Sequence, residues 1–296
     1  LNNHTYHYKY DSRNRLVEKK LPGKQWEYLV YDNQDRVVAV GPVLSPFGST
    51  TALPEDTPEQ GWLLTRYDIF GRVAYTGWLS TGLTGFSSTV RNTMQNSSVE
   101  IVQKKNPPLN IDNVPVSYTD VLPQTTKLLT VNYYDDYNFS GAPTTFPTVE
   151  GQTVITNCKG LTAGSWVRAL SSSSVIGETS YTFYDDKSRP IRTYTTNYLG
   201  GYTHIDSKLD FDGTVQYTVK RHKRLSTDGI LTIREDFSYT PQDRLSGHSH
   251  KINSLAAQTL ASFTYDKIGQ LTQKRVGTMT GSFSGPLQYV DYKYNI

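Results

Sequence analysis

The sequence contains a single cysteine, Cys158, among 296 residues, so no disulfide can form within the chain. Two methionines and few alanines leave little material for helices. No apolar run approaches the roughly 18 residues that a membrane-spanning helix needs. The formal net charge of +3 is small and evenly spread, which does not suggest a nucleic-acid partner. These features exclude a disulfide framework, and they predict neither a membrane span nor nucleic-acid binding.

Tyrosine is what the sequence has in excess, with 22 copies beside 10 phenylalanines and 4 tryptophans. Its ring covers apolar surface while its hydroxyl stays polar. Threonine and valine are also plentiful, and all three residue types favour strands. The composition therefore predicts an all-β protein.

One seven-residue motif recurs: Tyr-Asp, two variable residues, a turn residue, then Arg or Gln and a residue that restarts a strand. Its six copies are YDSRNRL (10–16), YDNQDRV (31–37), YDIFGRV (67–73), YDDKSRP (184–190), YTPQDRL (239–245) and YDKIGQL (265–271). The motif residues singled out are Tyr10, Asp11, Tyr31, Asp32, Tyr67, Asp68, Gly71, Tyr184, Asp185, Tyr239, Tyr265, Asp266 and Gly269. With Tyr134, Phe211 and Tyr294 as further anchors, many spacings lie between about 20 and 30 residues, a period typical of stacked supersecondary units.

Each copy has the pattern of a β-hairpin. Polar and apolar residues alternate before the anchor, as in SYTFY (180–184). The Asp carboxylate can accept hydrogen bonds from backbone N–H groups two residues on, which favours a turn. The fifth residue is Asn14, Asp35, Gly71, Ser188, Asp243 or Gly269. Most of these types tolerate a left-handed backbone. We therefore expect the repeated Asp to shape a turn rather than to catalyse a reaction.

These features predict antiparallel hairpins that join into one continuous, curved or spiralling sheet over residues 1–296. Neighbouring units must stack, because none is large enough to bury its own apolar face. Two stretches, 79–130 and 138–180, break the pattern with loop-rich sequence, and we interpret them as elaborated units of the same segment. The chain starts without Met and ends in YKYNI, which resembles a further copy cut short, so we expect a fragment of a longer protein.

The stretches YDSRNRLVEKKLPGKQWEYLVYDNQDRVV and LLTRYDIFGRVAYTGW resemble the YD-repeat, or RHS-repeat, proteins of bacteria. The resemblance covers residues 4–78 and 180–296 well and the middle of the chain less well. It implies a long β-sheet that spirals into a hollow shell, often around a toxic C-terminal domain. Related shells occur in insecticidal toxin complexes and in the adhesive teneurins of animals. The family's self-cleaving segment has no match here.

The same resemblance implies the partners and the location of the protein. The partners would be the remainder of the polypeptide or an associated secretion or shell component, together with an enclosed effector. LPGK and GRVAYTG are similar to stretches of long proteins exported to the outer surface of Gram-negative cells, for which type IX secretion is one candidate route. A shell that encapsulates a toxin is thus the first functional hypothesis. An adhesive or glycan-binding surface on the same sheet is the alternative.

Few residues suggest chemistry of their own. His248 and His250 share one strand face, a spacing that some metal sites use, but an exposed hairpin pair is the simpler interpretation. Acidic pairs at 135–136 and 185–186 suit either Ca²⁺ or turn capping, and capping explains them better. Trp26 and Trp78 are candidates for stacking on a ligand, with packing between units as the alternative. We expect no catalytic residues, metal or cofactor, and we expect Arg15, Arg36, Arg72, Arg189 and Arg244 to pair with carboxylates of neighbouring units.

Overall fold

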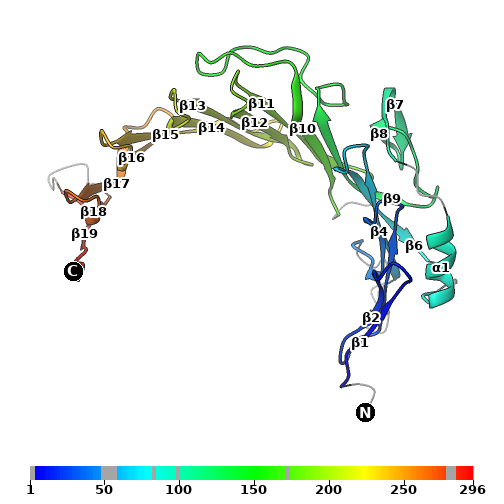
Figure 1. The fold of residues 1–296 in the computed structure, drawn as a ribbon. Coiled ribbons are helices and arrows are strands. Elements are labelled where there is room, and N and C mark those ends of the chain that lie inside the picture. Colours follow the sequence, from blue (N-terminus) through cyan, green and yellow to red (C-terminus); the bar gives the residue numbers. More distant parts are fainter. Residues whose placement is uncertain are drawn as a thin grey trace. The chain divides into compact units, whose positions relative to one another are not determined.

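The computed structural model describes residues 4–47, 59–81, 85–97, 101–170, 174–277 and 285–295. Apart from one helix, the elements assigned within these ranges are all strands (Figure 1). The first strands are β1 (His7–Tyr10), β2 (Leu16–Lys20), β3 (Trp26–Tyr31), β4 (Val37–Leu44), β5 (Gln60–Tyr67) and β6 (Val73–Ser80). Helix α1 (Ser88–Asn96) follows, and then β7 (Lys104–Ile111), β8 (Val114–Tyr118), β9 (Lys127–Asp135), β10 (Cys158–Arg168) and β11 (Gly177–Tyr184). The last strands are β12 (Pro190–Thr196), β13 (Gly200–Leu209), β14 (Val215–Leu225), β15 (Leu231–Tyr239), β16 (Leu245–Ile252), β17 (Gln258–Tyr265), β18 (Leu271–Val276) and β19 (Gln288–Asp291).

Seventeen of these strands form one antiparallel sheet that does not close, while β7 and β8 form a separate hairpin. Each strand of the large sheet pairs with the next strand along the chain, with β9 following β6. The same order continues from β11 to β19. The predicted fold class, repeated antiparallel hairpins in one continuous sheet, is confirmed.

Two compact units make up the chain. The first consists of Leu1–Ala142 with Gly164–Thr179, and the second of Pro143–Ala163 with Ser180–Ile296. Strands β10 and β11 contribute residues to both. All four tryptophans belong to the first unit, so tryptophan fluorescence reports on that unit alone.

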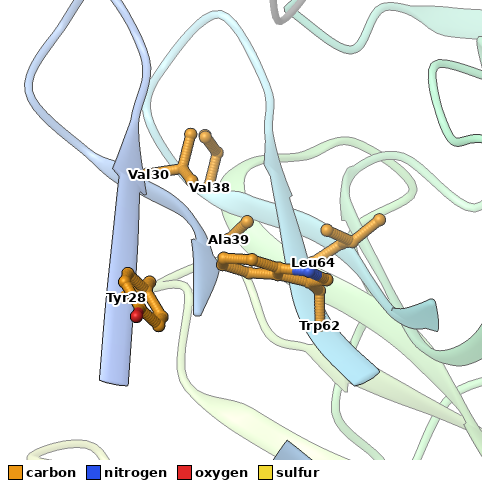
Figure 2. Packing of buried hydrophobic residues seen from close by; sticks show 6 residues of the cluster. All are labelled: Tyr28, Val30, Val38, Ala39, Trp62 and Leu64. Carbon is orange, nitrogen blue, oxygen red and sulfur yellow. The ribbon is translucent and has the colours of Figure 1, made fainter. Parts of the chain in front are cut away.

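The core of the first unit lies on one face of β3, β4 and β5. Alternate strand residues point to the same face, which brings Tyr28 and Val30 together on β3 and Trp62 and Leu64 together on β5. Figure 2 shows these side chains with Val38 and Ala39 of β4 between them. Val30 and Leu64 are each 1% exposed, so this face of the sheet is almost completely excluded from solvent here.

Helix α1 covers this core, and the sequence did not predict it. Ser87 caps its first turn, with its Oγ accepting a hydrogen bond of 3.2 Å from the Val90 N–H. Strand β3 pairs with β2 only as far as Tyr28. At Tyr31 the Gln95 side chain binds the backbone instead: its Oε1 accepts from the N–H at 3.0 Å, and its Nε2 donates to the carbonyl at 2.6 Å. The helix is thus held by the edge of β3, a long-range contact that a Ser-, Thr- and Asn-rich stretch does not reveal.

Candidate functional site

The turn at Asp68 shows how the repeated motif folds. Asp68 Oδ1 accepts hydrogen bonds from the backbone N–H groups of Phe70 and Arg72, both at 2.9 Å. Asp68 Oδ2 accepts a third from Arg72 Nε at 2.7 Å. The backbone closes the turn through the Asp68 N–H and the Gly71 N–H, which donate to the carbonyls of Arg72 and Asp68. The carboxylate is therefore fully engaged in shaping its own turn.

Four other turns repeat this geometry. The Oδ1 atoms of Asp11, Asp32, Asp185 and Asp266 each accept from the N–H groups two and four residues on, at 2.8 to 3.0 Å. The first three also bind the arginine four residues on, whereas Asp266 faces Gln270 and has no such ion pair. The six residues predicted to be left-handed have φ between 57° and 90°. In the copy YTPQDRL (239–245), Thr240 takes the place of the aspartate. Its Oγ1 accepts hydrogen bonds of 3.3 Å from the N–H groups of Gln242 and Arg244.

The structure adds two turns and corrects one anchor. Asn197 Oδ1 accepts from Leu199 and Gly201 N–H groups at 3.0 and 2.9 Å, a turn that the sequence analysis missed. The next turn starts at Asp210, not after Phe211 as the anchor set predicted. Phe211 lies inside that turn and is 86% exposed. Both turns share an Asx-x-x-Gly pattern, at 197–200 and 210–213, but neither opens with the Tyr-Asp pair of the repeated motif.

Gly71 provides a test of the left-handed position. Its φ is +79°, and a β-carbon there would lie 3.4 Å from Arg36 Nη1, a buried donor without a hydrogen-bond partner. Gly71→Val should lower the free energy of unfolding by about 1 to 3 kcal/mol, because a β-branched residue is strained at positive φ. Gly71→Asp should lose about 1 kcal/mol or less, since Asp tolerates this backbone and its carboxylate can reach Arg36. Urea titration followed by tryptophan fluorescence measures both, and equal losses would contradict the argument.

The anchor tyrosines link each turn to the turn before it. Their hydroxyls donate to the carbonyl of the residue that restarts the strand after the preceding turn, at 2.7 to 3.0 Å. The pairs are Tyr31 with Leu16, Tyr67 with Val37, Tyr134 with Val73, Tyr239 with Val215, Tyr265 with Leu245 and Tyr294 with Leu271. Tyr184 differs, because it donates to Thr162 of β10. We call these bonds the tyrosine latches. They explain why the anchor is tyrosine where phenylalanine would fill the same space.

A latch can be removed without changing the ring. Tyr67→Phe should lower the free energy of unfolding by roughly 1 kcal/mol, because it removes one hydrogen bond to the Val37 carbonyl. Tyr10→Phe is the matched control, since the Tyr10 ring is 58% exposed and its hydroxyl makes no hydrogen bond to the residues described. The control should change stability by less than about 0.5 kcal/mol. A Tyr67→Phe protein as stable as the control would show that the latches contribute nothing.

The motif arginines reinforce the same connection. Arg15, Arg36 and Arg72 lie over the rings of Tyr31, Tyr67 and Tyr134, with guanidinium-to-centroid distances of 4.8, 4.5 and 4.2 Å. Each arginine therefore binds the Asp of its own turn and contacts the tyrosine of the next.

The predicted pairing of these arginines with neighbouring carboxylates is right for two of five. Arg15 reaches Asp35 at 2.7 Å, and Arg72 binds Asp135 through two bonds of 2.9 and 2.7 Å. It is wrong for Arg36, Arg189 and Arg244, none of which binds a carboxylate of a neighbouring turn among the residues that the structure describes. The next turn presents glycine to Arg36 and Arg244, and Arg189 binds the carbonyls of Asp210 and Phe211.

A second polar cluster lies in the second unit, on β12, β13 and β14. Asp206 is 2% exposed and accepts hydrogen bonds from Arg192 Nε at 2.5 Å, Arg192 Nη2 at 2.9 Å, His204 Nε2 at 2.8 Å and Arg221 Nη1 at 3.1 Å. The strand register places Arg192 opposite Asp206 and His204 opposite Arg221. Burial alone would raise the pKa of Asp206, but the hydrogen bonds from His204 and Arg192 outweigh it and hold the pKa far below its usual value.

Three of the turn carboxylates show the same direction. Burial opposes ionisation of Asp11, Asp32 and Asp185, yet backbone N–H groups and the motif arginines hold the pKa of each below its usual value. A carboxyl whose folded pKa is depressed contributes stability above its unfolded pKa, about 3.9, and loses it as the pH falls through the folded pKa.

Acid should therefore destabilise the protein in a defined window. The urea midpoint should change little through these groups between pH 7 and 5. It should fall steadily below about pH 4 as Asp11, Asp32, Asp185 and Asp206 become protonated. Circular dichroism against urea at pH 7, 5, 4 and 3 measures this. A midpoint that stays constant down to pH 3 would contradict the assigned hydrogen bonds.

The structure places the remaining sequence candidates in ordinary packing roles. Trp78 is 4% exposed and packs edge-on against Phe47, so its ring offers no open face in this structure. Trp26 is half-buried, with Lys9 Nζ 4.7 Å from its ring centroid. His248 stacks on Phe237 and lies 3.2 Å from Glu235, while His250 contacts Gln258. Asp135 binds Arg72, and Asp136 Oδ1 accepts from the Asn138 N–H at 3.0 Å. Within the described ranges, no three His, Cys, Asp or Glu side chains are arranged to hold a metal.

Helix α1, at nine residues, is far too short to cross a membrane, and the described residues contain no longer helix.

No protein-family model matches the chain, and a search among curated proteins finds no match. Among solved structures, a TcdB2-TccC3-Cdc42 crystal structure matches with a TM-score of 0.26 and 11% identity, over 97% of this chain and 14% of that one. A TcdB2-TccC3-TEV crystal structure gives 0.25 and 13%, over 99% and 19%. The Tc holotoxin pore of Photorhabdus luminescens with a mutated TccC3 gives 0.20 and 13%, over 93% and 18%. The chain spans less than a fifth of the length of these matched chains.

Proposed function

We propose that this chain is a wall segment of a larger exported or cell-surface bacterial protein, and that the wall encloses or carries an effector domain. The observation that carries the proposal is the tyrosine latch. Six latches join a turn to the turn before it. The described sheet is therefore held both by strand pairing and by side chains that connect neighbouring copies of the repeat. Such an array resists local opening, which is what a barrier requires.

The state of the acidic residues supports a structural role over an enzymatic one. Five repeated Asp side chains accept backbone N–H groups of their own turns, and four of them also bind an arginine. A general acid or base needs a proton to exchange near the working pH. Depressed pKa values keep Asp11, Asp32 and Asp185 ionised and bonded within their turns. The resemblance of the motif to YD-repeat proteins points the same way.

Protease protection in the full-length protein tests the proposal. An enclosed effector should resist a protease that digests the same domain when it is expressed alone. Weakening the wall with Tyr31→Phe, Tyr67→Phe and Tyr265→Phe together should speed its digestion. Equal digestion of the free and the carried domain would overturn the enclosing role.

Exposed aromatic rings at the start of the chain favour the second candidate, an adhesive or glycan-binding surface. Tyr6, Tyr8 and Tyr10 are 66%, 48% and 58% exposed, and such rings can stack on sugars. Binding on a glycan array that falls in Tyr8→Ala and Trp26→Ala, but not in Phe211→Ala, would support this function. Phe211 is a suitable control because its ring is exposed but lies in the other unit. An array without signal for the wild-type protein would rule it out.

A further inference from the structure

A cavity in the first unit lies between helix α1 and the core face of the sheet. Its volume is about 430 Å³, inside the range of roughly 300 to 1,000 Å³ typical of small-molecule sites. The sheet contributes Val30, Trp62 and Leu64, the helix contributes Val90 and Met94, and Leu122 closes another side. Figure 2 shows Val30, Val38, Trp62 and Leu64 gathered on the face that forms this wall. The lining is thus mainly apolar.

Arg66 of β5 is the one charged side chain among the described residues that line this cavity. It is 7% exposed. Its Nε donates to the Val121 carbonyl at 3.4 Å, and its Nη1 donates to the carbonyls of Val38 and Thr65, both at 3.1 Å. Nη2 donates to no group in the described part of the chain, and no carboxylate there forms an ion pair with Arg66. Burial lowers the pKa of this guanidinium.

Every other arginine of comparable burial has a different arrangement. Arg168 binds Asp112. Arg91 forms no ion pair within the described residues, but its Nε, Nη1 and Nη2 all donate, to the Leu29 carbonyl, Asn92 and Gln95. A buried cation without a counter-ion is costly, and the cost falls when an anion binds it. Guanidinium groups bind carboxylates especially well, because their paired N–H donors match the two oxygens. Arg66 therefore has both a free donor and an electrostatic reason to take an anion.

We propose that the cavity binds an apolar carboxylate of small-molecule size, with the carboxylate on Arg66 and the hydrocarbon body against Trp62, Leu64 and Met94. The single positive charge matches a monoanion better than a phosphate, which carries more charge and needs more donors. The walls match an aliphatic or aromatic body, whose burial provides most of the binding free energy. This inference does not depend on the proposed wall function.

Calorimetric titration of the whole chain with octanoate tests the site, with 1-octanol as the uncharged ligand of the same length. The wild-type protein should bind octanoate at least tenfold more tightly than 1-octanol. Arg66→Met keeps the apolar stem and removes the charge, so it should weaken octanoate binding at least tenfold and leave 1-octanol binding unchanged. Arg275→Met, an exposed site in the second unit, is the matched control and should bind octanoate as the wild type does.

Met94→Trp gives an independent check, because it fills the cavity from the helix and leaves Arg66 in place. It should abolish binding of both ligands while circular dichroism stays that of the wild type. If Arg66→Met does not fold, the octanoate-to-octanol ratio and the Met94→Trp result decide the question. Failure of the wild type to bind octanoate, equal binding of the two ligands, or full binding by Met94→Trp would each overturn the proposal.

Discussion

Asp206→Asn is expected to lower the stability of the second unit by roughly 3 to 5 kcal/mol, the usual cost of removing one partner from a buried ion cluster. The substitution keeps the shape of the side chain but leaves Arg192 and Arg221 without the carboxylate that they share. Asparagine can accept a hydrogen bond but cannot balance two guanidinium groups. Because Asp206 joins residues of β12, β13 and β14, the loss should spread over all three strands.

Amide hydrogen exchange is the appropriate measurement, since the tryptophans all lie in the first unit and do not report on this one. Exchange in β12, β13 and β14 should become faster by a factor that corresponds to the lost stability. Asp236→Asn is the matched control. Asp236 binds Arg234, both side chains are 41% exposed, and the loss there should be about 0 to 1 kcal/mol. Similar exchange rates in the two variants would show that the cluster does not stabilise the sheet.

The second large effect is expected at Asp32, whose carboxylate has two separable roles. It accepts the N–H groups of Gln34 and Arg36 at 2.8 and 3.0 Å, and it binds the Arg36 guanidinium at 2.6 Å. Its side chain is 6% exposed. Asp32→Ala removes both roles and should cost about 3 kcal/mol or more, because it leaves buried donors and a guanidinium without partners.

Asp32→Asn removes only the charge. The amide oxygen can still accept the two backbone N–H groups, so we expect a loss of about 1 to 2 kcal/mol, clearly smaller than for alanine. Urea titration followed by tryptophan fluorescence compares the two proteins. An asparagine variant as unstable as the alanine variant would mean that the ion pair, rather than the turn, carries the stabilisation. Two variants as stable as the wild type would refute both roles.

The parts of the site that sequence reasoning could reach are the local ones. The Asp-to-backbone bonds span two and four residues, and the left-handed residue follows three positions after the Asp, so a seven-letter motif contains all the groups involved. The same reasoning failed where the motif varied. Asn197 performs the Asp role without a Tyr-Asp pair, and Phe211 has the aromatic character of an anchor but lies inside the turn.

Contacts between neighbouring copies of the repeat depend on which residue of the next turn lies opposite the motif arginine. Arg15 and Arg36 occupy the same motif position, yet Arg15 meets Asp35 while Arg36 meets Gly71. The identity of the facing residue is set by the alignment of two turns about 20 to 36 residues apart in the chain, which no single copy of the motif specifies. The sequence left ligand stacking open for Trp78 beside packing between repeats, and only the fold shows that its ring is buried.

The sequence alone determined the all-β class, the hairpin unit and the chemistry of its turns, because strand alternation and Asp capping act within a few residues. Only the tertiary structure decided the latch acceptors, the position of helix α1, the four-residue cluster around Asp206 and the burial of Arg66 without a carboxylate partner among the described residues. These features bring together residues that are distant in the chain. Their energies come from burial and from pairing across strands, which the order of the amino acids specifies only through the completed sheet.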